Sequence, residues 1–136
     1  MLRTLTVAVA ALALLPASAS AGGLAASLVP GYAGPLAGKR WTAHVLLDGC
    51  TTFEDYGVDP DAPRLEFRHV RTGRVVRATL HVDTSVVRPT YYPQQQRYLA
   101  AVTLPRAGTW TVRPVVTRNP RDTLGFDVRA RRAARR

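Results

Sequence analysis

Sulfur-containing residues are almost absent from the chain. Its 136 residues include one cysteine, Cys50, and one methionine, the initiator. A single cysteine excludes a disulfide within the chain, and we expect Cys50 to be buried or chemically inert. Sites for reduced copper favour thioether and thiolate ligands, which this sequence scarcely offers. We therefore predict no metal site and no other cofactor.

The motifs that commonly mark catalysis are also missing. The sequence has no Gly-x-Ser-x-Gly elbow, no glycine-rich phosphate loop and no His-Glu-x-x-His pair. Cys50 has no neighbouring histidine in the sequence that would activate it as a nucleophile. The chain is therefore predicted not to be an enzyme.

Two groups of residues keep a weaker claim to bind cations. His44, His69 and His81 fall on three predicted strands, and three converging imidazoles bind Zn²⁺ or Cu²⁺. His44 and His81 alternate with core positions, so ordinary strand histidines are the favoured interpretation. The loop 53–63 matches no calcium-binding loop, and a solvated acidic loop is favoured there. Its carboxylates are Glu54, Asp55, Asp59 and Asp61.

Long apolar runs are absent except near the start of the chain. An apolar stretch over residues 5–15 is followed by Pro16 and then by small residues. This order predicts a secretory signal peptide, residues 1–21, cleaved after Ala21. Because the stretch is too short to span a bilayer, a retained membrane anchor is the weaker alternative. We expect the mature chain to have no transmembrane span and to be secreted or periplasmic.

Acidic residues are few. The chain has 9 of them against 19 basic residues, all but Lys39 arginine, and a net charge of +10. A basic tail, residues 129–136, is not expected to contribute to the core. This charge favours anionic cell-surface polymers or lipids as partners, and export argues against nucleic acid. The interaction candidates in the tail are Arg129, Arg131, Arg132, Arg135 and Arg136.

Helical periodicity is missing as well. Short segments rich in valine, threonine and aromatic residues alternate with glycine, proline and asparagine. The predicted fold class is therefore all-β: one immunoglobulin-like antiparallel β-sandwich of about seven strands over residues 39–128. Residues 22–38, rich in glycine, alanine and proline, are expected to form an extended leader before it.

The expected strands alternate apolar and polar residues. The first covers residues 40–47, two hairpins follow at 64–82 and 97–116, and the last covers 123–128. A further strand is possible around residues 84–87. Trp110 is expected to fill the space between the sheets, and Pro114 predicts an edge strand or a bulge.

The second hairpin carries a family resemblance. From Tyr98 to Val112 the spacing is Tyr-x-Ala-x-Val-x-x-Pro-x-x-Gly-x-Trp-x-Val, and Gly38 and Trp41 mark a first strand upstream. Over roughly residues 36–116 the chain resembles the bacterial YtkA-like domains, which are exported immunoglobulin-like modules. Similar modules occur beside copper-handling and cytochrome-oxidase assembly proteins, so the resemblance also implies metal-related work.

A binding role is the predicted function. We expect a non-enzymatic extracytoplasmic module that binds a protein partner or assists assembly. Tyr91 and Tyr92 are interaction candidates because tyrosine is enriched at interfaces and the segment "PTYYPQQQ" is expected to be an exposed loop. The alternatives are a periplasmic copper-handling domain and a cationic domain that docks on anionic cell-surface polymers or lipids.

Overall fold

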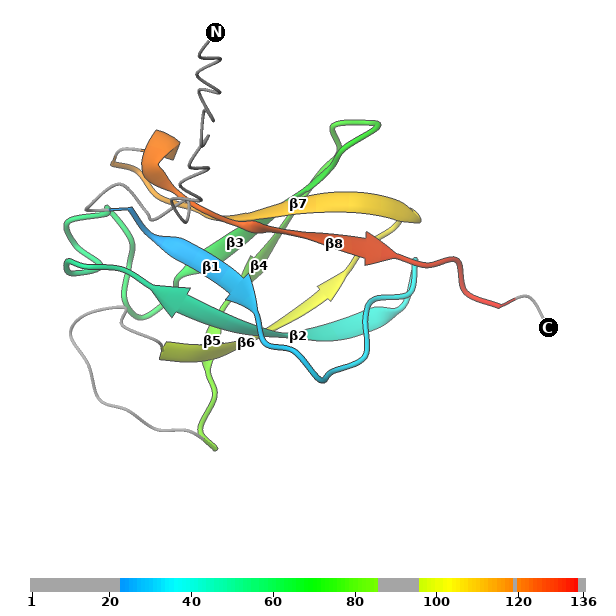
Figure 1. The fold of residues 1–136 in the computed structure, drawn as a ribbon, viewed down its shortest axis with the longest axis horizontal. Coiled ribbons are helices and arrows are strands. Elements are labelled where there is room, and N and C mark those ends of the chain that lie inside the picture. Colours follow the sequence, from blue (N-terminus) through cyan, green and yellow to red (C-terminus); the bar gives the residue numbers. More distant parts are fainter. Residues whose placement is uncertain (1–22, 86–95, 119, 135–136) are drawn as a thin grey trace, which may run out of the picture.

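The computed structural model describes residues 23–85, 96–118 and 120–134, and these ranges are all-β apart from one 3₁₀ turn, Pro120–Asp122. Eight strands form two antiparallel four-stranded sheets (Figure 1). The first sheet has the order β1 (Ala25–Leu28), β2 (Arg40–Asp48), β6 (Gln96–Thr103), β5 (His81–Val82). The second has the order β4 (Val75–Thr79), β3 (Arg64–His69), β7 (Gly108–Pro114), β8 (Phe126–Ala130).

Alternation along the strands decides which side chains enter the core. Successive strand residues point to opposite faces, so every second residue of a half-buried strand is apolar. In β2 the apolar residues at every second position are buried: Trp41, Ala43, Val45 and Leu47.

The core lies between the two sheets and takes residues from both. Trp110 is 0% exposed and is the largest fully buried side chain, which confirms its predicted place. Phe67, Leu65 and Leu104 are buried with it. Full burial of an apolar side chain of this size stabilises a fold by about 1.5–3 kcal/mol. These residues therefore hold the two sheets together.

Both segments expected to flank the domain take part in the sheets. The predicted leader contains β1, which pairs with β2, and both Leu24 before this strand and Ala26 within it are buried. At the other end β8 extends to Ala130, so Arg129 belongs to a strand rather than to a tail. Arg131 then forms a parallel bridge with Leu36.

The expected second hairpin is not a hairpin. β6 pairs with β2 and β5, whereas β7 pairs with β3 and β8 in the other sheet. The connection from Leu104 to Ala107 therefore crosses from one sheet to the other. Inward alternation is the same for a hairpin and for two strands that face each other, so the pattern could not distinguish them. Pro114 ends β7 inside its sheet, not at an edge.

The strand expected over residues 74–82 is divided between the sheets. β4 pairs with β3, and after Leu80 the chain joins the other sheet as β5. Val82, which is in phase with the buried residues Ala78 and Leu80, is 46% exposed. Thr84 and Ser85 form a turn, so a strand does not begin there, and residues 86–87 lie outside the described ranges.

A candidate anion-binding groove

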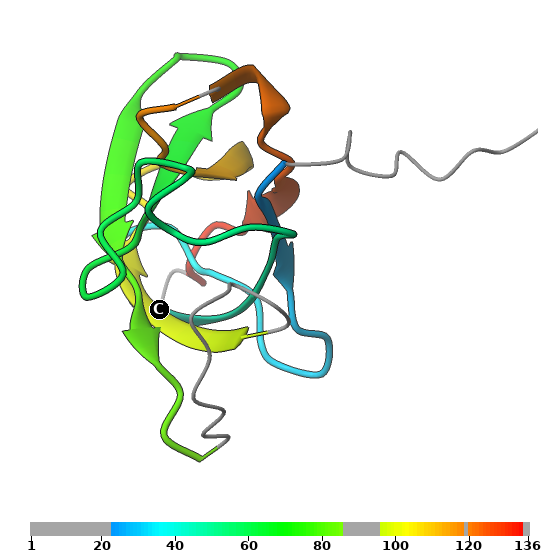
Figure 2. The same ribbon diagram turned by 90° about the vertical axis from the view of Figure 1, so that its left-hand side faces the viewer.

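The topology separates the charged loops of the molecule. The loop between β2 and β3 carries four of the nine acidic residues of the chain and lies at one end of the sheets (Figure 1). In Figure 2 this end faces the viewer. The turn after β3, the connection between β6 and β7, and the segment after β8 lie at the opposite end, because their strand ends pair with one another.

The opposite end is basic. Its loops are residues 29–39, 70–74, 104–107 and 131–134, and within these described segments there is no acidic residue. Six cations belong to them: Lys39, Arg71, Arg74, Arg106, Arg131 and Arg132.

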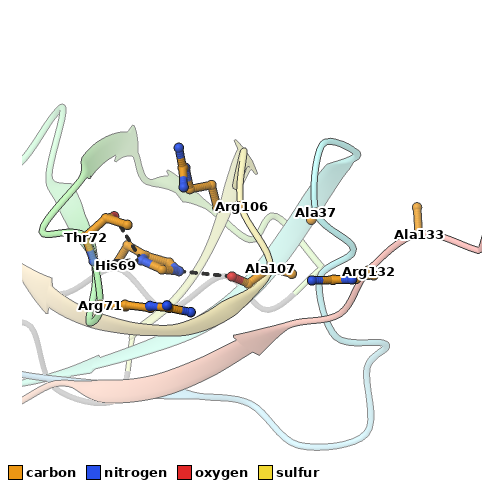
Figure 3. A pocket seen from close by; sticks show the side chains of 8 residues that line it. All are labelled: Ala37, His69, Arg71, Thr72, Arg106, Ala107, Arg132 and Ala133. Carbon is orange, nitrogen blue, oxygen red and sulfur yellow. Dashed lines mark hydrogen bonds between the residues drawn. The ribbon is translucent and has the colours of Figure 1, made fainter.

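These loops enclose a groove that is open to solvent (Figure 3). Its volume is 1080 Å³. Three arginines, one from each of three loops, line it together with His69, Thr72 and small alanines. The arginines are Arg71, Arg106 and Arg132.

His69 joins two of the three loops. Its ring is 4% exposed, and Nδ1 accepts the main-chain N–H of Thr72 at 3.1 Å. Nε2 lies 3.0 Å from the carbonyl oxygen of Ala107. Because Nδ1 accepts a hydrogen bond, the ring proton is on Nε2, which donates to Ala107, and the ring is neutral. The turn that carries Arg71 is thereby held to the connection that carries Arg106.

Trp110 and Gly108 help to fix the positions of His69 and of the connection that carries Arg106. The indole Nε1 of Trp110 donates to the carbonyl oxygen of Arg106 at 3.0 Å, and its ring meets His69 edge-on at 4.9 Å. Gly108 has a φ of 121°, and a Cβ at this position would lie 2.9 Å from Nε2 of His69. Glycine is therefore required here both by the backbone and by the approach of the imidazole.

The third side of the groove is fixed by main-chain hydrogen bonds. The N–H of Arg131 donates to Pro35 at 3.1 Å, and the N–H of Ala37 donates back to Arg131 at 2.8 Å. Gly38 donates to Leu104 at 2.8 Å. The segment that carries Arg132 is thus part of the fold, and the groove is formed before any ligand arrives.

The guanidinium groups of the groove are not neutralised within the part of the chain that the structure describes. Its two ion pairs both involve Glu66, with Arg68 at 3.0 Å and with Arg77 at 3.3 Å. In Figure 3 the side chains of Arg71 and Arg132 extend toward each other, whereas Arg106 extends away. A planar guanidinium binds carboxylate or phosphate oxygens through two parallel hydrogen bonds. The arrangement therefore suits an anion with more than one charged group.

Of the residues predicted from the sequence, only Arg132 lies in the groove. Arg129 and Arg131 are exposed beside it. Tyr91, Tyr92, Arg135 and Arg136 lie outside the described residues. Sequence reasoning missed Arg71, Arg106 and His69 as a group, because each belongs to a different loop and only the topology joins those loops. The available signal was a basic residue in each turn.

The residues considered for metal binding do not gather at one place: His44 and His81 flank Leu99 in the first sheet, whereas His69 lies in the second sheet. The ring of His44 stacks on Tyr32 at 3.5 Å, His81 is exposed on β5, and His69 is buried in its hydrogen bonds. Across the described ranges no group of three or more His, Cys, Asp or Glu residues is placed to hold a metal ion.

Cys50 is exposed, which excludes burial and leaves chemical inertness as the untested half of the expectation. It follows the end of β2, where the chain leaves the sheet, and its main-chain N–H donates to the hydroxyl of Tyr56 at 3.0 Å. Burial of Tyr56 is the main cause that raises the pKa of that phenol. The buried partner in this contact is therefore the tyrosine and not the thiol.

The acidic loop is stabilised from within. The carboxylate of Asp55 accepts the hydroxyl of Thr51, which is the main reason that the pKa of Asp55 lies below its usual value. The N–H of Asp61 donates to the carboxylate of Asp59 at 2.9 Å. The carboxylates of Asp55 and Asp59 thus accept hydrogen bonds from residues of their own loop.

Two further findings bear on the identity of the protein. In the described part of the chain no helix has both the length and the apolar character needed to cross a membrane. Comparison with known proteins finds no matching family model, no matching curated protein and no matching solved structure, so the resemblance to YtkA-like domains stays a prediction.

Proposed function

We propose that this protein is a non-enzymatic, extracytoplasmic binding module with an immunoglobulin-like β-sandwich, which docks on an anionic partner through the arginine groove. The observation that carries the proposal is the set of three guanidinium groups on three loops, without an acidic residue among the residues that line the groove. The two antiparallel sheets and the expected signal peptide support the remainder.

The groove favours anion docking over copper handling and over the binding of a protein partner through the tyrosine loop. A copper-handling role has little support, because the described residues include no group of three or more His, Cys, Asp or Glu side chains placed to hold a metal ion. The tyrosine loop falls outside the described residues. The loops of the groove, in contrast, are joined by hydrogen bonds, so their backbone loses little conformational entropy when the groove binds a ligand.

The magnitude expected for this docking is modest for each contact. An exposed ion pair contributes about 0–1 kcal/mol, since water and salt compete with it. Several such contacts made by one ligand add up, and they weaken together as salt shortens the Debye length to about 8 Å at physiological ionic strength. Binding should therefore need a multivalent anion and fall as salt rises.

The first prediction concerns the groove arginines. In the double variant Arg71→Gln, Arg132→Gln, affinity for an anionic polymer should fall about tenfold, because two contacts together contribute about 1–2 kcal/mol. Fluorescence anisotropy with labelled polyphosphate and polyglutamate at low salt measures this loss. Neutral dextran should not bind either form.

The matched control removes the same charge from the other end. Arg118 and Arg121 are exposed in the connection before β8. The variant Arg118→Gln, Arg121→Gln has the same net charge as the groove variant and should keep nearly the parent affinity. If both variants lose affinity equally, total charge rather than the groove governs binding and the proposal fails.

A further inference from the structure

The arginines of this protein are not confined to the groove. The outer face of the sheet β4-β3-β7-β8 carries five of them, against the carboxylates of Glu66 and Asp127. Glu66 already pairs with Arg68 and Arg77. Five positive charges less two negative charges leave this face at +3. The five arginines are Arg64, Arg68, Arg77, Arg113 and Arg129.

A second hollow lies on this face. It is lined by Arg68, Arg113, Thr111 and Glu66. The strand register places these residues side by side, since Glu66 is opposite Arg113 and Arg68 is opposite Thr111. The hollow therefore spans the two central strands, β3 and β7.

Strand β8 connects the second hollow to the groove. Arg129 is opposite Thr109 on the neighbouring strand, and Arg131 and then Arg132 follow it along the chain. Alternate residues of a strand lie about 6.6 Å apart, so Arg129 and Arg131 present charges at that spacing. Asp127 is the residue of β8 opposite Thr111 of the hollow, and after it no acidic residue occurs in the described segment 128–134. Positive charge thus continues from Arg129 on the face of the sheet to Arg132 at its end.

We infer that one linear polyanion occupies both the outer face and the groove. The hollow lies on the face of a sheet and the groove lies at the ends of the strands, so the two surfaces meet at an edge. A flat membrane cannot contact two surfaces that meet in this way, and a small anion fills only one of them. A flexible chain with repeated negative charges follows the bend. This inference rests on the proposed function and adds to it the class of ligand.

The second prediction is that affinity depends on the length of the polyanion. Inorganic polyphosphate chains of increasing defined length should bind more tightly until one chain reaches both the groove and the second hollow. Longer chains should give no further gain in affinity. Joining two weak sites through one ligand gives a gain on the order of tenfold or more. The slope of log Kd against log salt should also become steeper for the long chains, because they release more counterions.

A variant on the sheet face isolates the second hollow. Arg113 and Arg129 are exposed and form no ion pair with the described residues, so Arg113→Gln, Arg129→Gln leaves the Glu66 pairs intact. This variant should keep the parent affinity for short chains and lose the gain with length, with a salt slope lower by about two. Circular dichroism of each variant confirms that it is folded, and Arg118→Gln, Arg121→Gln is again the charge-matched control.

The possible outcomes separate the inference from the function on which it rests. If the affinity does not depend on the length of the polyphosphate, and the groove variant still binds short chains more weakly than the parent, the inference alone is overturned. An absence of binding at every length overturns both. If vesicles of anionic lipid bind more tightly than long polyphosphate and the face variant has no effect on them, the occupant is a membrane surface and the inference is again wrong.

Discussion

At the scale of single residues, Trp110 links the core to the groove. It is fully buried between the sheets, and its indole also holds the carbonyl oxygen of Arg106. The same side chain therefore contributes apolar burial to the fold and a hydrogen bond to the loop that carries a groove arginine. Its loss should affect stability first and binding second.

The third prediction follows from this position. Trp110→Ala should lower the free energy of unfolding by about 3–5 kcal/mol, because it removes a large buried side chain and leaves a cavity. Urea denaturation monitored by circular dichroism measures the change. Val82→Ala is the control, since Val82 is half exposed and its truncation should change stability by less than about 0.5 kcal/mol. An unchanged midpoint for Trp110→Ala would mean that the two sheets do not pack around this residue.

Tyr98 provides a test at high pH. Its side chain is 3% exposed, and burial raises the pKa of the phenol to about 12. In the unfolded chain a tyrosine ionises near pH 10. Between about pH 10 and pH 12 the unfolded state therefore loses a proton that the folded state keeps, and stability falls as pH rises. Below pH 10 this contribution to stability is fully present.

The fourth prediction is that Tyr98→Phe reduces this alkaline loss. Urea unfolding of the parent and the variant at pH 8 and pH 11.5 gives two differences in stability to compare. At pH 8 the difference in unfolding free energy between parent and variant reports the loss of the hydroxyl alone. If the variant loses less stability than the parent between pH 8 and pH 11.5, that difference reports the ionisation of Tyr98. An equal decline in both proteins would show that Tyr98 ionises as readily in the folded state as in water.

At the scale of elements, β1 and β8 are the two strands that depend most on their surroundings. β1 has the sequence Ala-Ala-Ser-Leu, and small residues of this kind favour neither a strand nor a turn strongly. It becomes a strand because β2 offers an edge and the core accepts Ala26. β8 continues past the last apolar residue of the predicted strand because Ala130, 1% exposed, packs inside.

The fifth prediction concerns the C-terminal segment. Deletion of residues 133–136 should leave the melting temperature nearly unchanged, whereas deletion of residues 130–136 should lower it. The longer deletion removes buried Ala130 and the two main-chain hydrogen bonds of Arg131, each of which contributes about 1 kcal/mol. This reverses the expectation from sequence that the whole tail lies outside the core. Equal melting temperatures would restore that expectation.

At the scale of the whole molecule, the direction of the strands sorts the charges. Each strand has one end near the acidic loop between β2 and β3 and the other end near the groove. The ends of β3, β6 and β8 and the starts of β2, β4 and β7 meet near the groove, so loops that are far apart in sequence gather there. Four of the nine acidic residues lie in the loop between β2 and β3 and none lies in the described loops at the groove end, and this uneven field would orient the molecule toward an anionic partner.

The sequence by itself determined the properties that depend on neighbouring residues. Alternation assigned the buried faces of β2, β3, β6 and β7, because the strand period is a local consequence of backbone geometry. The Thr72-Gly73 turn and the surplus of arginine were equally visible. Each of these properties can be established without knowing which strands pair.

The tertiary structure decided everything that depends on pairing. It placed β6 and β7 in different sheets, added β1 from a segment with no strand pattern, and brought Arg71, Arg106 and Arg132 to one groove. Local sequence cannot fix these results, because a strand with one apolar face can meet several partners at similar local cost. Only the packing of the complete core, with Trp110 and His69 beneath the loops, selects one arrangement.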